Sequence, residues 1–292
     1  MIQQINAAAA GTITFGGDLT VNRLGYGAMR ITGKGIWGPP ENRDAAIAAV
    51  RRAVELGCNF IDTADSYGPH VSEELIAEAL APYPSQVVVA TKAGWERPGP
   101  GQWTHNASPS HLREALDGSL KRLRLDRIDL YQLHTPDLAV SFEASMETLA
   151  QLREQGKIRH IGLSNVTREH IERARKIVPI VSVQNRYSFA DREWDYVVNY
   201  CAENSMVFIP WAPLGSGKRV SEELERVAEK LGATPLQVAL AWLLKRSPVM
   251  LPIPGTSSRK HVDENIAAAG LELPQADFTQ LAAVTPPPNS LR

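Results

Sequence analysis

The sequence predicts an α/β protein built as a (β/α)₈ TIM barrel with an N-terminal β-hairpin. Eight short apolar runs recur along the chain and alternate with amphipathic stretches that end near a glycine or a basic residue. Strands that are apolar on both faces and alternate with helices indicate a parallel sheet covered by helices. No polar linker separates the eight units, which favours a closed barrel over an open six-stranded sheet with a separate helical domain.

The elements follow in order from local patterns. Two alternating runs, Thr12–Phe15 and Leu19–Val21, flank the turn 16–18 and predict the hairpin. The barrel strands are expected at 24–29, 59–61, 87–90, 128–133, 160–163, 180–183, 206–209 and 249–253. Helices are clearest over 43–56, 142–155 and 236–245, the last with Thr234 and Pro235 as N-cap and first-turn proline.

These elements account for the length of the chain as a single domain, residues 1–292. We expect the hairpin at about 11–23, the barrel at about 24–270 and a short C-terminal tail, in keeping with the size of known barrels. We expect this short tail to provide no long C-terminal flap that closes a pocket.

Charge and composition exclude several classes of protein. The chain has 31 basic and 32 acidic side chains, so no overall field draws it to nucleic acid or to an anionic membrane. Cys58 and Cys201 lie outside metal-ligand spacings, and we expect buried thiols in a reducing compartment and no metal. The start of the sequence lacks the features of a signal peptide, and the sequence contains no apolar run of about 18 residues, so we expect no targeting or membrane-spanning segment. We therefore expect a cytoplasmic protein without membrane or nucleic-acid partners, monomeric or weakly oligomeric.

Titratable side chains follow three successive predicted strands, where barrel enzymes gather their catalytic groups. They are Asp62 with Tyr67, Lys92, and His134. A tyrosine has a pKa near 10 and is a weak acid at neutral pH unless a cation such as Lys92 stabilises its phenolate. Asp62 can keep that ammonium charged, and His134 can hydrogen-bond a carbonyl oxygen. The set suits the delivery of a proton to a developing alkoxide.

Motifs along nearly the whole chain resemble those of the aldo-keto reductase superfamily. They are Asn59-Phe-Ile-Asp62-Thr-Ala-Asp-Ser-Tyr67-Gly68, Val89-Ala-Thr-Lys92, Asp129-Leu-Tyr-Gln-Leu-His134, Ile161-Gly-Leu-Ser164-Asn165, Val183-Gln184-Asn185 and Trp211-Ala-Pro213-Leu-Gly215. The resemblance implies that Tyr67 is the general acid in reduction. It implies that Lys92 and Asp62 tune this acid and that His134 orients the carbonyl.

The resemblance also implies NADP(H) as cofactor, close to Asp62. Ser164, Asn165 and Gln184 would hold the nicotinamide carboxamide, and Trp211 would stack on the ring where relatives commonly have Tyr or Phe. Pro213, Leu214 and Gly215 would approach the pyrophosphate, and Gly27 to Met29 would line the floor near the ribose.

The segment 254–265 is expected at the adenine end of the cofactor. Gly255, Thr256 and Ser257 put small hydrogen-bonding groups at a helix start beside Arg259 and Lys260, which suits a phosphate and favours NADP(H) over NAD(H). Many relatives have an arginine where this chain has His261, so either cation or His261 remains a candidate for the 2′-phosphate. Glu264 and Asn265 would recognise the adenine amino group.

Three tryptophans, Trp37, Trp95 and Trp103, fall in loops after the first and third predicted strands. We expect them to form an apolar substrate wall, with loop anchoring as the alternative. The motifs predict NADPH-dependent reduction of an aldehyde or ketone to an alcohol. The amino-acid sequences of segments 21–29, 37–40 and 67–70 resemble those of bacterial pyridoxal reductases. The reduction of pyridoxal to pyridoxine is therefore the leading specific reaction.

Two other functions remain open from the residues. Lys92 on a barrel strand could attack a carbonyl as the nucleophile of a Schiff-base lyase or aldolase. The chain could also be a nucleotide-sensing barrel subunit that binds NADPH without turnover.

Overall fold

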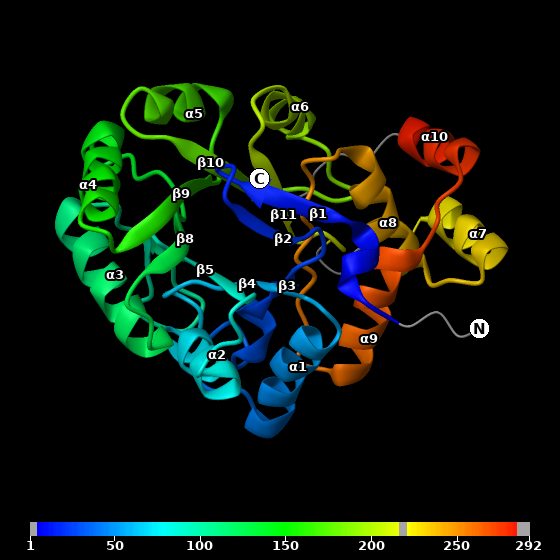
Figure 1. The fold of residues 1–292 in the computed structure, drawn as a ribbon, viewed down its shortest axis with the longest axis horizontal. Helices are drawn as coiled ribbons and strands as arrows, with labels where there is room; N and C mark the ends of the chain where they lie inside the picture. Colours follow the sequence, from blue (N-terminus) through cyan, green and yellow to red (C-terminus); the bar gives the residue numbers. More distant parts are fainter. Residues whose placement is uncertain (1–4, 216–220, 285–292) are drawn as a thin grey trace.

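A curled parallel sheet forms the centre of the computed structural model, which describes residues 5–215 and 221–284. Its strands pair in the order β11-β10-β9-β8-β5-β4-β3, and Figure 1 shows helices arranged around them. The bounds are β3 (Tyr26–Gly27), β4 (Phe60–Asp62), β5 (Val88–Ala93), β8 (Ile128–Leu133), β9 (Ile158–Ser164), β10 (Ile180–Arg186) and β11 (Val207–Trp211). Seven of the eight predicted barrel strands are thereby confirmed.

The prediction of an eighth strand at 249–253 was wrong. Proline has no N–H to donate to a ladder, and Pro252 interrupts the segment while Pro248 and Pro254 flank it. The segment nevertheless lies between β11 and β3, the two outer strands of the sheet, and is hydrogen-bonded to the chain on both sides. The bonds run from Phe208 N to Val249 O (2.8 Å), Leu251 N to Phe208 O (2.9 Å), Gly25 N to Pro252 O (2.9 Å) and Gly27 N to Pro254 O (3.4 Å).

Several helices begin directly after a capping residue. Asn42 caps the first, and Thr234 and Gln237 form a reciprocal capping box on the eighth. The helices are α1 (Arg43–Glu55), α2 (Val71–Leu80), α3 (Pro109–Leu123), α4 (Phe142–Glu154), α5 (Arg168–Arg175), α6 (Asp195–Glu203), α7 (Glu222–Leu231), α8 (Pro235–Arg246), α9 (Arg259–Ala267) and α10 (Gln275–Ala283), with short 3₁₀ turns η1 (Ala7–Ala10), η2 (Ala28–Ile31) and η3 (Ala268–Gly270). The three predicted helices correspond to α1, α4 and α8. The expected C-terminal tail contains α10, and residues 285–292 lie outside the described part of the chain.

The predicted hairpin is present as β1 (Thr12–Phe15) and β2 (Leu19–Asn22), and it lies across the middle of the ring in Figure 1. Phe15 is fully buried and stacks on Phe60 at the start of β4, with 5.4 Å between ring centroids. Asp18 in the turn accepts from His160 Nε2 at 2.6 Å. The hairpin therefore packs on residues from the beginnings of the strands and leaves their carboxyl ends open.

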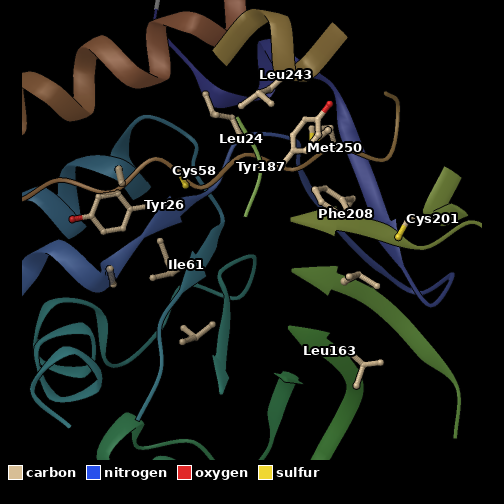
Figure 2. Packing of buried hydrophobic residues seen from close by; sticks show 14 of the residues in the cluster. Leu24, Tyr26, Cys58, Ile61, Leu163, Tyr187, Cys201, Phe208, Leu243 and Met250 are labelled. Atoms are coloured by element: carbon tan, nitrogen blue, oxygen red, sulfur yellow. The ribbon is translucent and has the colours of Figure 1, made fainter. Parts of the chain in front are cut away.

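Besides the apolar cluster around Phe15 and Phe60, an apolar layer lies between the sheet and the helices. Figure 2 shows part of it, with Leu24, Ile61 and Phe208 on the strand side and Leu243 from α8. Both cysteines are free and buried, as predicted, and burial raises the pKa of the Cys58 thiol to about 12. No helix in the described ranges is long and apolar enough to span a bilayer.

Replacing Phe15 tests the contribution of the hairpin to stability. We expect Phe15→Ala to lower the free energy of unfolding by about 3–5 kcal/mol, because it empties a fully buried aromatic site. Urea unfolding followed by circular dichroism measures this change. The control is Thr14→Ala on the exposed face of β1, which should change stability by no more than about 0.5 kcal/mol. Equal effects of the two variants would contradict the proposed packing.

Candidate active site

A cavity of about 420 Å³ opens at the carboxyl ends of the strands. It brings together residues from most of the predicted groups, since the ends of parallel barrel strands meet on one face. Its lining comprises Gly27, Met29, Arg30, Ile36, Asp62, Tyr67, Trp95, Trp103, His134, Ser164, Asn165, Gln184, Trp211, Ala212, Pro213, Leu214, Gly215, Ile253, Pro254 and Gly255.

Lys92 lies beneath this cavity on β5 and is completely buried. Its Nζ donates to Asp62 Oδ2 and to Thr63 O, both at 2.8 Å, and lies 5.3 Å from the centroid of the Tyr67 ring. Burial by itself would lower the pKa of the Lys92 ammonium, but Asp62 and Tyr67 together raise it above its usual value. The charged ammonium is a poor nucleophile, which argues against a Schiff base on Lys92.

Asp62 is held from several strands at once. Its Oδ1 accepts from Gln184 Nε2 on β10 at 2.8 Å and from Gln132 Nε2 on β8 at 3.4 Å, while Oδ2 faces Lys92. Sequence reasoning missed Gln132. The available signal was its position two residues before His134, because alternate residues of a strand face the same side.

Tyr67 is buried and lines the cavity. Burial raises the pKa of its phenol above the usual value, and the Lys92 charge opposes that rise. The phenol therefore carries its proton at neutral pH, and the nearby ammonium reduces the cost of losing it.

His134 meets Tyr67 edge to face, with 5.8 Å between ring centroids. Burial, with a smaller contribution from the Lys92 charge, holds the pKa of His134 well below its usual value. A neutral imidazole keeps one N–H donor and one acceptor nitrogen, so it can donate to a carbonyl oxygen. Its Nδ1 lies 3.5 Å from the hydroxyl of Ser66, which the sequence did not single out.

The opposite wall carries the residues expected to hold a nicotinamide. Trp211 Nε1 donates to Asn165 Oδ1 at 2.9 Å, and Asn165 Nδ2 donates to His134 O at 2.9 Å and to Ser164 Oγ at 3.2 Å. Asn165 and Ala212 adopt the left-handed backbone conformation, with φ of 57° and 51°. This wall offers an anchored aromatic surface beside amide and hydroxyl groups, a donor set that fits a carboxamide-bearing aromatic ring.

The floor of the cavity requires glycine. A Cβ on Gly27 would lie 2.6 Å from Ile253 O, and one on Gly255 would lie 2.5 Å from Gly27 O. Two backbones thus meet directly where the cofactor ribose was predicted, with no side chain between them.

In the segment expected at the adenine end, Pro254 and Gly255 line the cavity and the other residues lie outside its lining. The helix α9 begins at Arg259 with Ser258 as N-cap, two to four residues later than the expected start at 255–257. Arg259 and Lys260 therefore occupy its first turn, and Lys260 lies 3.7 Å from Glu264. Thr256 contributes its carbonyl to the Tyr26 hydroxyl, Ser257 precedes the cap, and Asn265 is buried.

The three tryptophans divide into two groups. Trp95 and Trp103 line the cavity and pack edge to face at 5.8 Å. Trp37 is not among the lining residues, and it stacks instead beside the Arg97 guanidinium, 5.5 Å from the guanidinium carbon to the ring centroid. This matches the loop-anchoring alternative for Trp37. Arg97 had no signal in the sequence, because its partners lie in loops distant along the chain.

The described residues hold no group of three or more His, Cys, Asp or Glu side chains placed to bind a metal ion. A curled parallel sheet with this cavity and this set of side chains is typical of an oxidoreductase of the aldo/keto reductase family. That family matches residues 23–286, and the chain belongs to it.

The chain is similar to individual members of this family along most of its length. An uncharacterized oxidoreductase of Schizosaccharomyces pombe is 46% identical, covering 95% of this chain and 90% of its own. Pyridoxine 4-dehydrogenase of Escherichia coli is 45% identical, covering 92% and 96%. Among solved structures, an aldo-keto reductase from Klebsiella pneumoniae in complex with NADPH superposes with a TM-score of 0.80 at 27% identity, covering 95% of each chain.

The neutral state of His134 makes stability depend on pH. An unfolded histidine takes up a proton as the pH falls through about 6.5, and the folded His134 does not, so acid favours the unfolded chain. We expect wild type to lose up to about 1.4 kcal/mol per pH unit below 6.5 relative to His134→Gln. Urea unfolding of both proteins at pH 7.0 and 5.5 measures the difference. Parallel pH dependences would show that the folded His134 takes up a proton over the same pH range as the unfolded histidine.

Proposed function

We propose that the protein reduces an aldehyde or ketone to an alcohol with NADPH, and that Tyr67 donates the proton. The observation that carries this proposal is the buried Lys92 ammonium, fixed by Asp62 and adjacent to a phenol at the edge of the cavity. A cation in that position favours the phenolate that proton donation leaves behind.

Each polar group then has one task. When bound, NADPH supplies the hydride that reaches the carbonyl carbon. Tyr67 gives its hydroxyl proton to the carbonyl oxygen, Lys92 stabilises the resulting phenolate, and His134 donates a hydrogen bond that orients the oxygen. Solvent restores the proton on Tyr67 after the alcohol leaves.

The substrate that we propose is an aromatic aldehyde, with pyridoxal as the specific candidate and pyridoxine as product. Trp95 and Trp103 present two ring surfaces at the substrate side of the cavity, and aromatic rings pack well against such surfaces. The similarity to pyridoxine 4-dehydrogenase over most of both chains supports the choice of pyridoxal.

The cofactor assignment rests on both halves of the proposed binding site. Gln184, Ser164 and Asn165 would hold the carboxamide, Trp211 would stack on the ring, and Gly27, Met29 and residues 213–215 would contact the ribose and pyrophosphate. For the 2′-phosphate, Gly255, Thr256, Ser257 and the first turn of α9 with Arg259 and Lys260 provide donors and positive charge. Glu264 and Asn265 would contact the adenine. The NADPH complex of the Klebsiella pneumoniae relative supports the same cofactor.

We also propose that the whole chain is one domain whose sheet closes into an eight-membered (β/α)₈ barrel. The support is the segment 249–254, which is hydrogen-bonded toward both β11 and β3. A monomer or weak oligomer remains our prediction.

Removing the Tyr67 hydroxyl tests the proton donor. We expect Tyr67→Phe to lower kcat at least about 100-fold, because general acid catalysis contributes that much or more. NADPH affinity should stay within about twofold, since the ring is retained and the lost hydroxyl serves the substrate. Steady-state NADPH oxidation and fluorescence titration measure the two quantities. The control is Tyr196→Phe, which removes a half-exposed hydroxyl on α6. Retention of most activity in Tyr67→Phe would exclude Tyr67 as the acid.

Nucleotide discrimination tests the phosphate site. We expect wild type to bind NADPH more tightly than NADH. The double variant Arg259→Gln/Lys260→Gln should bind NADPH about 10-fold or more weakly and NADH as wild type does, because charge-assisted bonds to the extra phosphate disappear. Fluorescence titration with each nucleotide measures this. Arg168→Gln is the control, because Arg168 also begins a helix and pairs with a glutamate four residues later. Equal wild-type affinities for the two nucleotides would refute the site.

A further inference from the structure

Arg97 connects three loops at the substrate side of the cavity. It follows the short strand β6 (Trp95–Glu96), is 9% exposed, and donates to main-chain carbonyl oxygens of separate segments. The bonds are Nε to Gln102 O (2.9 Å), one terminal nitrogen to both Ile36 O (2.9 Å) and Ser66 O (3.0 Å), and the other to Gly35 O (3.4 Å). The loops after β3, β4 and β5 thus meet at one side chain.

Aromatic rings complete the surroundings of this cation. The guanidinium carbon lies 3.7 Å from the centroid of Trp103 and 5.5 Å from that of Trp37. The hydrogen bonds that Arg97 makes within the described residues all go to carbonyl oxygens, and no carboxylate there forms an ion pair with it. A buried cation is costly unless its donors are satisfied, so the carbonyls and rings must keep these positions for Arg97 to remain there.

The tethered residues surround the place where a carbonyl substrate must bind. Ile36 and Trp103 line the cavity, and Ser66 directly precedes Tyr67 and faces His134. The bond to Ser66 O therefore links the apolar wall to the segment that carries the proton donor. The nicotinamide side of the cavity, built from Asn165, Gln184 and Trp211, has no contact with Arg97 among these interactions.

We propose that Arg97 is a positioning residue that sets the width of the substrate end of the cavity and thereby the preference for aromatic over small aliphatic aldehydes. The inference rests on the proposed carbonyl reductase function. The separation between the Trp103 wall and Tyr67 decides whether a flat ring is held with its carbonyl at the acid. A small aldehyde does not reach that wall and is insensitive to the separation.

The planar guanidinium is required for this role. Its donors point in several fixed directions, so it can bond Gln102 O on one side and Ile36 O and Ser66 O on another. A lysine ammonium concentrates its donors on one atom and cannot serve all these carbonyls together. Methionine fills similar volume and makes none of the bonds.

The experiment compares Arg97→Met and Arg97→Lys with the matched control Arg192→Met. Arg192 also packs on two aromatic rings, Phe189 and Trp242, and also donates to main-chain carbonyls, but it lies outside the cavity. The assays measure kcat and KM for pyridoxal, benzaldehyde and propanal with NADPH. They also measure NADPH affinity and the melting temperature.

We expect Arg97→Met to lower kcat/KM for the two aromatic aldehydes about 10-fold or more, mainly through KM, and that for propanal less than about threefold. Arg97→Lys should fall between wild type and Arg97→Met, and it replaces Arg97→Met as the test if that variant does not fold. NADPH affinity should be unchanged in both. Arg192→Met should lower the melting temperature and leave the ratio of aromatic to aliphatic kcat/KM unchanged.

Two results would overturn the proposal. One is an unchanged ratio of aromatic to aliphatic kcat/KM in the Arg97 variants, and the other is the same shift in Arg192→Met, which would reveal a general effect of stability. Failure of the proposed function looks different, because wild type itself would then oxidise no NADPH with any of the three aldehydes, whether or not it binds the nucleotide.

Discussion

The buried ion pair between Lys92 and Asp62 is the interaction on which the rest of the site depends. A completely buried ammonium is costly to desolvate, and the 2.8 Å contacts with Asp62 and Thr63 O compensate this cost. The same charge acts on two neighbours: it opposes the rise in the pKa of Tyr67 and contributes to the low pKa of His134. One cation thus favours proton release from a phenol and adds to the effect of burial in disfavouring a charged imidazole.

The fold separates the groups that give stability from those that give chemistry. The hairpin packs Phe15 on Phe60 over the beginnings of the strands, which makes that end apolar and closed. The carboxyl ends carry the buried polar network, where Gln184 and Gln132 join Lys92 on Asp62. Because these side chains come from four strands, the sheet must be assembled before the network can exist.

The two sides of the cavity are built differently. The nicotinamide side uses residues within strands or directly after them, such as Gln184 and Trp211, and the sheet fixes their positions. The substrate side uses loops, which are joined through Arg97 and the rings around it. Loops on a shared barrel vary freely in length and composition, and our proposals accordingly place the reaction chemistry at the strand ends and substrate preference in the loops.

Local sequence patterns determined the hairpin, seven strands, the capped helices and the strand-end positions of the four proposed catalytic residues, because periodicity, capping and strand-end motifs act over a few neighbouring residues. The prediction of a strand at 249–253 was wrong, because proline cannot donate to a ladder. The carbonyl groups of the segment nevertheless accept hydrogen bonds from Phe208 on one side and Gly25 on the other. Nothing in the sequence indicated the contacts of Arg97 and Ser66, because their partners are distant in the chain. Tertiary structure alone decided the pKa directions: the sequence suggested that Lys92 would stabilise the Tyr67 phenolate, but burial outweighs that effect in the folded protein, and burial is a property of packing.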